Sequence, residues 1–534
     1  MSKNKINLIL INRPQKEFAW DLGDIFISEP IVDSINQILK ANLLDPSIKA
    51  WYLCDPSLCN PNSSVIQNLL RKPGDVWHGG LSLGLKNQPE CLKYVAPQWM
   101  LIVDPKDDIE AISWRLSLRS CLIKADILRT LGLPSAKYLS LEAAGLELGK
   151  RYISKGAIIK NTPAFSPNKT QKEIRIRFDD EIRFIFDTYG KKWADWTLIH
   201  CLPSKPVPTI RTFLQMKKWI RGTIDAPNSS IPDGFTNAKI SVVLPTFNRY
   251  DYLPGCLESL RSQSKKPDEI IVVDQNKMED RRPDIYKNFN DLNITVIWQN
   301  ETGQCKARNA AIVEATGEYL FFADDDSSYH PETIQQHESA LTFFGADGST
   351  GISVPPQKYT IPHEYTYFRI ASNLDTGNSL IKKSTVMRAG GFDLNYDYGK
   401  GADQDLGMRI YLTGGVLVHN PIAQRVHYKA KGGLRDFGVL WNNRSVRKSM
   451  PRPPVTTVYY LMRFFPEHLR KQAIFQAIYT AQIPSSQVRE KRTKGIIMAL
   501  MNEFIKLPRT LILLRGINRK AKKMIELGPQ LLDK

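Results

Sequence analysis

The sequence of 534 residues has few cysteines and no two of them in CxxC spacing. Seven is an odd number, and their spacing predicts neither a disulfide framework nor a common type of zinc site. The chain also lacks an uncharged apolar run of about 18 residues, which a membrane-spanning helix needs. The early apolar run from Ile6 to Ile11 is too short for a signal peptide and predicts a strand. A soluble or peripheral protein of the reducing cytosol is therefore expected.

Negative charge is scarce as well. With 54 Asp and Glu against 73 Lys and Arg, the formal net charge is +19, which favours an anionic partner. The excess is concentrated at one end, because residues 440–534 contain 19 Lys and Arg but only 5 Asp and Glu. No RNP-like, zinc-finger or helix-turn-helix pattern accompanies this charge, so nucleic acid is not expected as a partner.

Short apolar strands alternate with helices in the second half of the chain. Strands are expected at 239–245, 269–274, 294–299, 319–323 and 415–419, with helices at 252–262 and 305–315. This order is typical of α/β proteins and predicts a mainly parallel sheet.

A weak internal repeat suggests how the length is divided. Residues 121–163 laid over 379–421, an offset of 258, share 11 of 43 residues. We interpret the repeat as a duplicated α/β domain, the alternative being two similar helices with matching turns. The predicted domains are a first copy at 1–165, a helical connector at 166–237, a second copy at 238–440 and a basic helical region at 441–534.

The basic C-terminal region has apolar helical segments flanked by Lys and Arg, for example at 458–465 and 495–501. Such helices can lie on an anionic membrane surface. The equally weighted alternative is that they pack on the preceding domain with basic outer faces. The expected location is accordingly the cytoplasm, with peripheral contact at the inner face of the cell membrane left open.

The sharpest local pattern is the apolar strand at 319–323, which ends in Asp324, Asp325 and Asp326. Ligands of open α/β sheets bind beyond the carboxyl ends of strands, so these acids are expected to face a crevice. Asp324 and Asp326 would point to the same side and could hold one Mn²⁺ or Mg²⁺ ion. A solvated acidic turn is the alternative.

Several ordered motifs between about Ala238 and Arg435 resemble family 2 glycosyltransferases of the GT-A fold. The strands at 241–249 and 270–274 resemble the family's nucleotide loop and second strand, and 317–326 resembles the strand with the DxD motif. The resemblance implies a GT-A-type nucleotide-diphospho-sugar transferase domain. Its substrates would be a nucleoside diphosphate sugar donor and a glycan, lipid-linked or other hydroxyl acceptor.

The resemblance also implies roles for individual residues. The donor nucleotide would contact Pro245, Thr246, Phe247, Asn248, Arg249, Asp274, Arg308, Asp324 and Asp325. The metal would be held by Asp324, Asp326 and His427, and the acceptor by Gly377 and Asn378. Alternatives stay open at three positions, because Asp274 can serve as a cap, Arg308 can pair with a local carboxylate, and His427 can be structural. The basic segment 431–435 after His427 is expected to form a lid.

Asp403 begins a predicted helix and resembles the general base of the family. The family usually has Gly-Glu-Asp there, whereas this chain has Gly-Ala-Asp, so the acceptor contact of the missing Glu is in doubt. Asp405 and Arg409 are interpreted as an i,i+4 helix pair. The reaction expected from the resemblance is a metal-dependent sugar transfer with inversion. The alternative is an inactive scaffold that binds sugar nucleotides or glycans.

The first copy lacks the residues that carry this chemistry. At the offset of 258, Gly145 takes the place of Asp403, and the acidic triplet is reduced to Asp55-Pro56-Ser57. The first copy is therefore predicted to be a degenerate GT-A-like domain with a scaffolding or acceptor-binding role.

Overall fold

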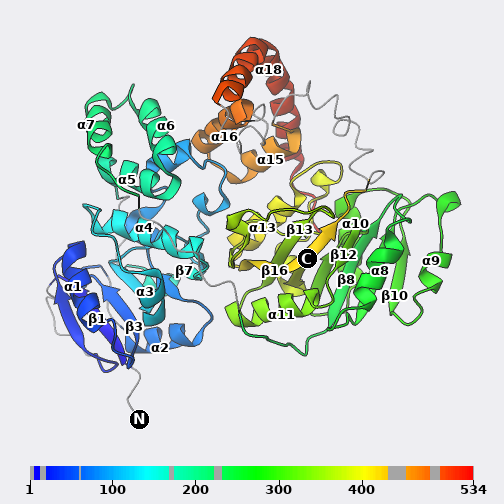
Figure 1. The fold of residues 1–534 in the computed structure, drawn as a ribbon, viewed down its shortest axis with the longest axis horizontal. Coiled ribbons are helices and arrows are strands. Elements are labelled where there is room, and N and C mark those ends of the chain that lie inside the picture. The colour runs from blue at the N-terminus through cyan, green and yellow to red at the C-terminus, as the bar shows by residue number, and fades with distance from the viewer. Residues whose placement is uncertain are drawn as a thin grey trace.

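The structure, a computed structural model, describes residues 5–12, 20–58, 62–167, 174–221, 231–430, 453–480 and 493–532. Figure 1 shows two α/β units side by side, the first in blue and cyan and the second in green and yellow, with the C-terminal helices in orange and red. Cys59 and the expected lid at 431–435 lie outside the described residues.

The first unit is built on a seven-stranded sheet. Its strand order is β2 (Ile25–Ser28), β1 (Lys5–Ile11), β3 (Ile48–Cys54), β6 (Ser120–Lys124), β4 (Val76–His78), β7 (Ile159–Asn161) and β5 (Ala111–Ile112). Its helices are α1 (Val32–Asn42), α2 (Ser63–Arg71), α3 (Ala125–Leu131) and α4 (Leu141–Ser154). The apolar run of β1 is almost fully buried, as expected for a strand inside a sheet.

The second unit is built on a nine-stranded sheet. Its order is β10 (Ile294–Trp298), β9 (Glu269–Asp274), β8 (Ile240–Thr246), β11 (Tyr319–Ala323), β15 (Asn378–Lys382), β13 (Gly348–Val354), β16 (Leu417–His427) and β12 (Ser327–Tyr329), with β14 (Arg369–Ile370) also beside β16. Its helices are α8 (Leu253–Arg261), α9 (Asp284–Lys287), α10 (Gln304–Glu314), α11 (Thr333–Phe344), α12 (Lys383–Arg388) and α13 (Ala402–Leu412).

The second sheet is mixed, which corrects the expectation of a mainly parallel one. The four strands β10, β9, β8 and β11 are parallel, but β15 runs antiparallel to both β11 and β13. The chain between β13 and β15 contains no crossover helix, and a parallel neighbour requires such a connection.

The two units share one strand topology. The strands β3, β6, β4, β7 and β5 take the places of β11, β15, β13, β16 and β14, with the same relative directions. The offset of 258 residues also aligns the starts of β6 and β15, and those of β7 and β16. This shared topology is what a duplicated α/β domain would give, and the duplication stays a prediction.

An equivalent ion pair lies in each copy. In α4, Arg151 pairs with Glu147 at 2.8 Å, and in α13 Arg409 pairs with Asp405 at 2.7 Å. Both arginines also donate to a backbone carbonyl at the end of the preceding helix, that of Leu131 in the first copy and that of Ala389 in the second. The interpretation of Asp405 and Arg409 as a helix pair is confirmed.

The connector is helical, as predicted, and its helices pack on the first copy. It contains α5 (Phe178–Tyr189), α6 (Lys191–Cys201) and α7 (Pro206–Met216). The ring of Phe184 in α5 stacks on that of Trp114, with centroids 5.6 Å apart. The connector thus completes the core of the first unit.

The copies contact each other directly. The Tyr411 hydroxyl of α13 donates to the Val103 carbonyl at 2.7 Å. Gly156, at φ +94°, lies so close to the second copy that a Cβ atom there would be 2.5 Å from the carbonyl oxygen of Phe368. A larger residue at position 156 would therefore push the copies apart.

The C-terminal helices are α15 (Val455–Phe464), α16 (Glu467–Thr480) and α18 (Thr493–Leu527). In α15, Val458 and Tyr459 are buried, and Arg463 pairs with Asp393 at 2.9 Å and with Asp405 at 2.8 Å. For α15, packing on the second copy is therefore the interpretation that holds. Within the described ranges, no helix is both long and apolar enough to cross a membrane. Contact of the basic region with an anionic surface stays a prediction, which flotation on liposomes with and without anionic lipid tests.

Buried His337 on α11 makes stability depend on pH. Its Nδ1 lies 2.8 Å from Ser349 Oγ and its Nε2 3.1 Å from Asn378 Oδ1, and burial lowers its pKa to about 4. The unfolded chain binds this proton below about pH 6.5, so the stabilisation is complete above that pH and is lost as the pH falls towards 4. Between pH 7 and pH 5, His337→Gln should lose about 2 kcal/mol less stability than the wild type.

Denaturant unfolding at the two pH values measures this difference. The control is His363→Gln, because His363 is exposed, and it should keep the wild-type dependence. An unchanged pH dependence in His337→Gln would contradict the assignment.

Candidate active site

The acidic triplet lies at the carboxyl edge of the second sheet, in the turn between β11 and β12. Because β8, β9 and β11 are parallel, their carboxyl ends meet at this edge. A cavity opens there, lined by Pro245, Thr246, Phe247, Arg249, Gln275, Gln304, Arg308, Asp324, Asp325, Asp326 and His427. The structure thus brings together most of the residues predicted to bind the donor and the metal.

Asp324 lies between two arginines. Its Oδ1 accepts a hydrogen bond from Arg308 at 3.0 Å, and its Oδ2 accepts one from Arg425 at 2.8 Å. The alternative for Arg308, pairing with a local carboxylate, is therefore what the structure contains. Arg308 also lines the cavity, and its predicted contact with the donor stays a prediction.

Asp325 points towards β8. Its Oδ2 accepts from Thr246 Oγ1 at 2.8 Å, and its Oδ1 accepts from Arg249 at 3.0 Å. Burial raises the pKa of Asp325 to about 6, against the opposing charge of Arg249. Asp325 thus ties the acidic turn to the loop after β8.

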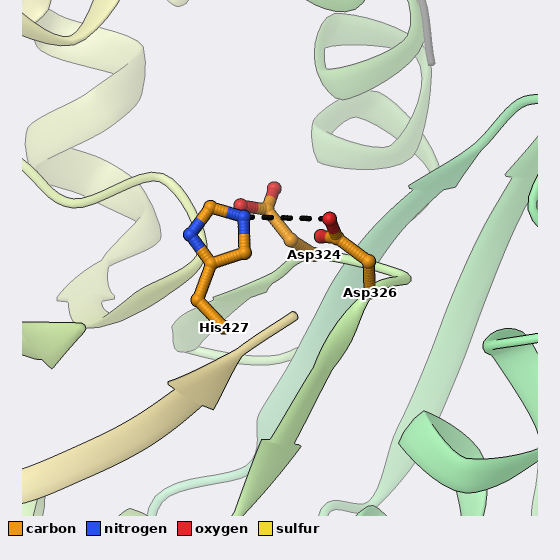
Figure 2. Close-up of side chains that lie close together, drawn as sticks. All are labelled: Asp324, Asp326 and His427. Atoms are coloured by element: carbon orange, nitrogen blue, oxygen red, sulfur yellow. Dashed lines mark ion pairs between the residues drawn. The ribbon is translucent and has the colours of Figure 1, made fainter. Parts of the chain in front are cut away.

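Asp326 faces His427, the last residue of β16 (Figure 2). The His427 Nε2 lies 3.4 Å from Asp326 Oδ2, and the Ala430 N–H donates to the same oxygen at 2.9 Å. Burial opposes ionisation, but the hydrogen bond with His427 and the charge of Arg249 outweigh it, so the pKa of Asp326 is lowered. Asp326 is accordingly an anion at neutral pH.

These side chains form a candidate cation site. One ligand atom each from Asp324, Asp326 and His427 lies within 4.8 Å of the others. Oδ1 of Asp326 is buried and has no hydrogen-bond partner among the residues that the structure describes. Two carboxylates and an imidazole suit Mn²⁺, and Mg²⁺ also accepts carboxylate oxygens. The residues present therefore fit a divalent cation.

The nucleotide loop is only partly directed into the cavity. Pro245, Thr246, Phe247 and Arg249 line it. Asn248 has a positive φ of 52°, and its backbone N–H donates to Asn276 Oδ1 at 2.9 Å. Asn248 is thus held in a tight turn, and its predicted contact with nucleotide stays a prediction.

Asp274 is buried at the end of β9. Its carboxylate accepts from Tyr250 at 2.7 Å and from Tyr286 at 2.6 Å, as well as from the Asn276 backbone and side chain. Gln275, the next residue, lines the cavity. The capping role left open for Asp274 is present, and its contact with a base stays a prediction.

The start of α10 is closed by a carboxylate. Oδ1 of Asp397 accepts from the N–H groups of Cys305 at 2.6 Å and Lys306 at 3.0 Å. N–H groups at the start of a helix can bind a diphosphate, but in the structure these two already have a partner. Any phosphate contact from α10 would therefore come from the side chain of Arg308.

Asp403 lies in a second, larger cavity of about 730 Å³, which also contains Asp375. Arg425 connects the two cavities, because it donates to Asp324 at 2.8 Å and to Asp375 at 3.0 Å. A Cβ atom on Gly377 would lie 2.0 Å from the Arg425 guanidinium, so only glycine leaves room for this arginine. Asp403 thus lines the larger cavity, and the Arg425 guanidinium lies between one carboxylate of each cavity.

Asn378 is buried inside the sheet. Its Nδ2 donates to the Ala423 carbonyl at 2.9 Å, and its Oδ1 pairs with His337. This places Asn378 as a link between strands, and its predicted contact with an acceptor stays a prediction.

The sequence reasoning missed Arg425 and Asp375. Arg425 lies two residues before His427 on β16, so both side chains point to the same face of the strand. That spacing was the available signal for Arg425. Asp375 gave no comparable signal, because its role depends on Arg425 reaching it from another strand.

In the first copy an arginine occupies the corresponding place. Arg119 aligns with Gly377 and donates to Asp55 at 2.8 Å and to Glu142 at 2.7 Å. Asp55 aligns with Asp324 by sheet register, because Cys54 pairs with Ser120 as Ala323 pairs with Asn378. A built-in cation therefore lies beside the one retained carboxylate.

A family model and several curated proteins match part of this chain. The family model described as Glycosyl transferase family 2 matches residues 241–394. The poly(ribitol-phosphate) beta-N-acetylglucosaminyltransferase TarS of Staphylococcus aureus (strain MW2) is 29% identical over 188 residues, which are 33% of this chain and 33% of TarS. A poly(ribitol-phosphate) beta-glucosyltransferase of Bacillus spizizenii is 34% identical over 134 residues, 23% of this chain and 21% of that protein.

The crystal structure of S. aureus TarS 1–349 in complex with UDP-GlcNAc shares 19% identity, covers 53% of this chain and 87% of that chain, and has a TM-score of 0.36. The matches to the two curated relatives span about a third or less of those proteins' own length. The family match includes the acidic triplet but ends before Asp403 and His427.

Proposed function

We propose that this protein transfers a sugar from a nucleoside diphosphate sugar to an acceptor hydroxyl, because residues 241–394 match the family model described as Glycosyl transferase family 2. The reaction is metal-dependent and inverts the anomeric carbon. The observation that carries the proposal is the cluster of Asp324, Asp326 and His427 in a cavity with two arginines at its edge.

Asp324, Asp326 and His427 would hold a divalent cation, Mn²⁺ or Mg²⁺. When bound, such a cation supplies a Lewis acid that offsets the negative charge developing on the departing diphosphate. Arg308 and Arg425, both bonded to Asp324, keep further positive charge at the same edge. The loop with Thr246 and Arg249, fixed through Asp325, forms the nucleotide side of the cavity.

Asp403 is the proposed general base. It takes the proton of the acceptor hydroxyl as that oxygen bonds to the anomeric carbon, while the bond from this carbon to the diphosphate oxygen breaks with its electron pair. Attack from the face opposite the diphosphate inverts the centre. A base within hydrogen-bond reach of the hydroxyl accelerates such a step by about 10² to 10⁴.

The first copy is proposed to bind no nucleotide sugar. Asp55 is its only counterpart of the acidic triplet, and Arg119 neutralises it from within. Ser57 takes the place of Asp326 in the first copy, so the one retained carboxylate cannot supply the pair of acids proposed to hold the cation in the second copy. The boundaries proposed for the four regions remain 1–165, 166–237, 238–440 and 441–534.

Product analysis with a panel of nucleotide sugars and Mn²⁺ tests the proposal. A transferase releases free nucleoside diphosphate in amounts that match the glycosylated acceptor, whereas a nucleotidyltransferase releases pyrophosphate. The alternative is a scaffold that binds sugar nucleotides or glycans without turnover. It releases neither product, so the absence of both products with every donor in the panel would favour it.

A further inference from the structure

The large cavity that contains Asp403 continues between the two copies. It shares Trp99, Glu364, Arg369, Ala371 and Ser372 with a neighbouring cavity of about 180 Å³. The smaller cavity is otherwise lined by Leu101, Lys150, Ile153 and Ser154 of the first copy and by Tyr367 and Ile370 of the second. Together they form one cleft, named here the intercopy cleft, which runs from the proposed base to α4 of the first copy.

The first copy contributes an aromatic and a basic side chain to this cleft. Lys150 extends from α4, with its Nζ 4.2 Å from the centre of the Trp99 ring. Trp99 is itself fixed by the ring of Trp114, 5.6 Å away between centroids. The side chains of Lys150 and Trp99 are partly exposed and line the cleft.

The second copy contributes another cation. Arg369 of β14 lies over the ring of Tyr365, 5.3 Å from its centre, and its Nε donates to the Glu364 carbonyl at 2.8 Å. Lys150 donates to Ser154 Oγ at 3.2 Å. Over the described ranges, no carboxylate oxygen lies within 4 Å of the charged nitrogens of Lys150 or Arg369.

Two like charges therefore line one cleft without a paired acid. Burial and the charge of Arg369 lower the pKa of Lys150 to about 8. Arg369 also acts on His419 in the larger cavity, whose pKa is lowered to about 4 by burial and by this charge. Glu364 is the acidic residue in the described lining of the smaller cavity, and its carboxylate forms an ion pair with neither cation. An anion bound between Lys150 and Arg369 would relieve this repulsion.

We infer that the intercopy cleft is the acceptor subsite and that Lys150 and Arg369 bind a phosphate group carried by the acceptor. The inference rests on the proposed function for the identity of the second substrate. Trp99 and Tyr365 line the cleft and offer apolar contacts for sugar or polyol carbons beside the phosphate. The hydroxyl that reacts would lie towards Asp403, in the same cleft. The first copy then serves as a recognition domain for the acceptor.

Direct binding tests the inference without any transfer reaction. The probe is a glycerol phosphate tetramer, titrated by calorimetry into the full-length protein. The double variant Lys150→Met/Arg369→Gln is expected to weaken binding by about 10-fold or more, because each lost cation removes a charge-assisted hydrogen bond. Glu364→Gln should tighten binding, because it removes the negative charge on the lining.

The matched control is Lys137→Met, an exposed lysine of the first copy outside the cleft, which should bind the probe as the wild type does. Arg369→Gln alone supplies the same test if the change at Lys150 prevents folding. Equal binding by the wild type and the Arg369 variant would overturn the inference. Tighter wild-type binding of a tetragalacturonate, which carries carboxylates, would overturn the choice of phosphate. Because no donor is present, failure of the proposed transfer leaves this measurement intact.

Discussion

Asp403→Asn is expected to lower the turnover number by at least about 10²-fold while leaving the affinity for the donor nucleotide unchanged. The amide has nearly the same size but cannot take the proton of the acceptor hydroxyl. Asp403 lines the larger cavity and not the one formed by the acidic triplet. Initial rates of nucleoside diphosphate release, together with calorimetric titration of the donor nucleotide, measure the two effects separately.

The control for this variant is Asp284→Asn, an exposed acid on α9, which should keep wild-type turnover. A variant at Asp403 that retains more than a few per cent of wild-type turnover would reject this residue as the base. Weakened donor binding with normal turnover at saturation would instead place Asp403 on the donor side.

Asp326→Asn is expected to abolish the dependence of nucleotide binding on Mn²⁺. Removing a group that only hydrogen-bonds to a metal ligand already lowers metal affinity by about 10- to 100-fold. Removing a ligand itself should lower the affinity at least as much. The titration uses the nucleoside diphosphate that the wild-type protein selects from the donor panel, with and without Mn²⁺. The ratio of the two affinities should fall towards one.

Asp325→Asn is the matched control, because this carboxylate is the neighbour of Asp326 in sequence but bonds to Thr246 and Arg249. It should weaken nucleotide binding and keep the ratio of affinities with and without Mn²⁺. If Asp326→Asn keeps that ratio too, the metal lies elsewhere.

The sequence predicted the strands whose own residues are apolar. The strand at 269–274 has the predicted bounds, and that at 319–323 likewise. In contrast, β13 contains Gly348, Ser349 and Gly351, so it has no apolar run that would predict a strand. Its burial comes from pairing with β15 and β16, which are remote in sequence. The predicted strand at 415–419 was too short, because β16 continues to His427 through its pairing with β12 and β13.

The candidate site was predictable where the chemistry is local. Asp324 and Asp326 are two residues apart, and the geometry brings them together with His427 as expected. Arg425 reaches Asp324 across 101 positions, which only the closed sheet determines. For the same reason the closure of α10 by Asp397 was not visible in the sequence.

Arg425 has a thermodynamic consequence for the order of substrate binding. Its guanidinium shares its hydrogen bonds between Asp324 on the donor side and Asp375 on the acceptor side. A ligand that interacts with the Asp324 carboxylate would change the strength of the hydrogen bond between Arg425 and Asp375. Binding free energies that are linked in this way are reciprocal. Binding of a ligand in either cavity would then change the affinity of the other cavity for its own ligand by the same factor. One guanidinium can therefore make donor binding and acceptor binding cooperative.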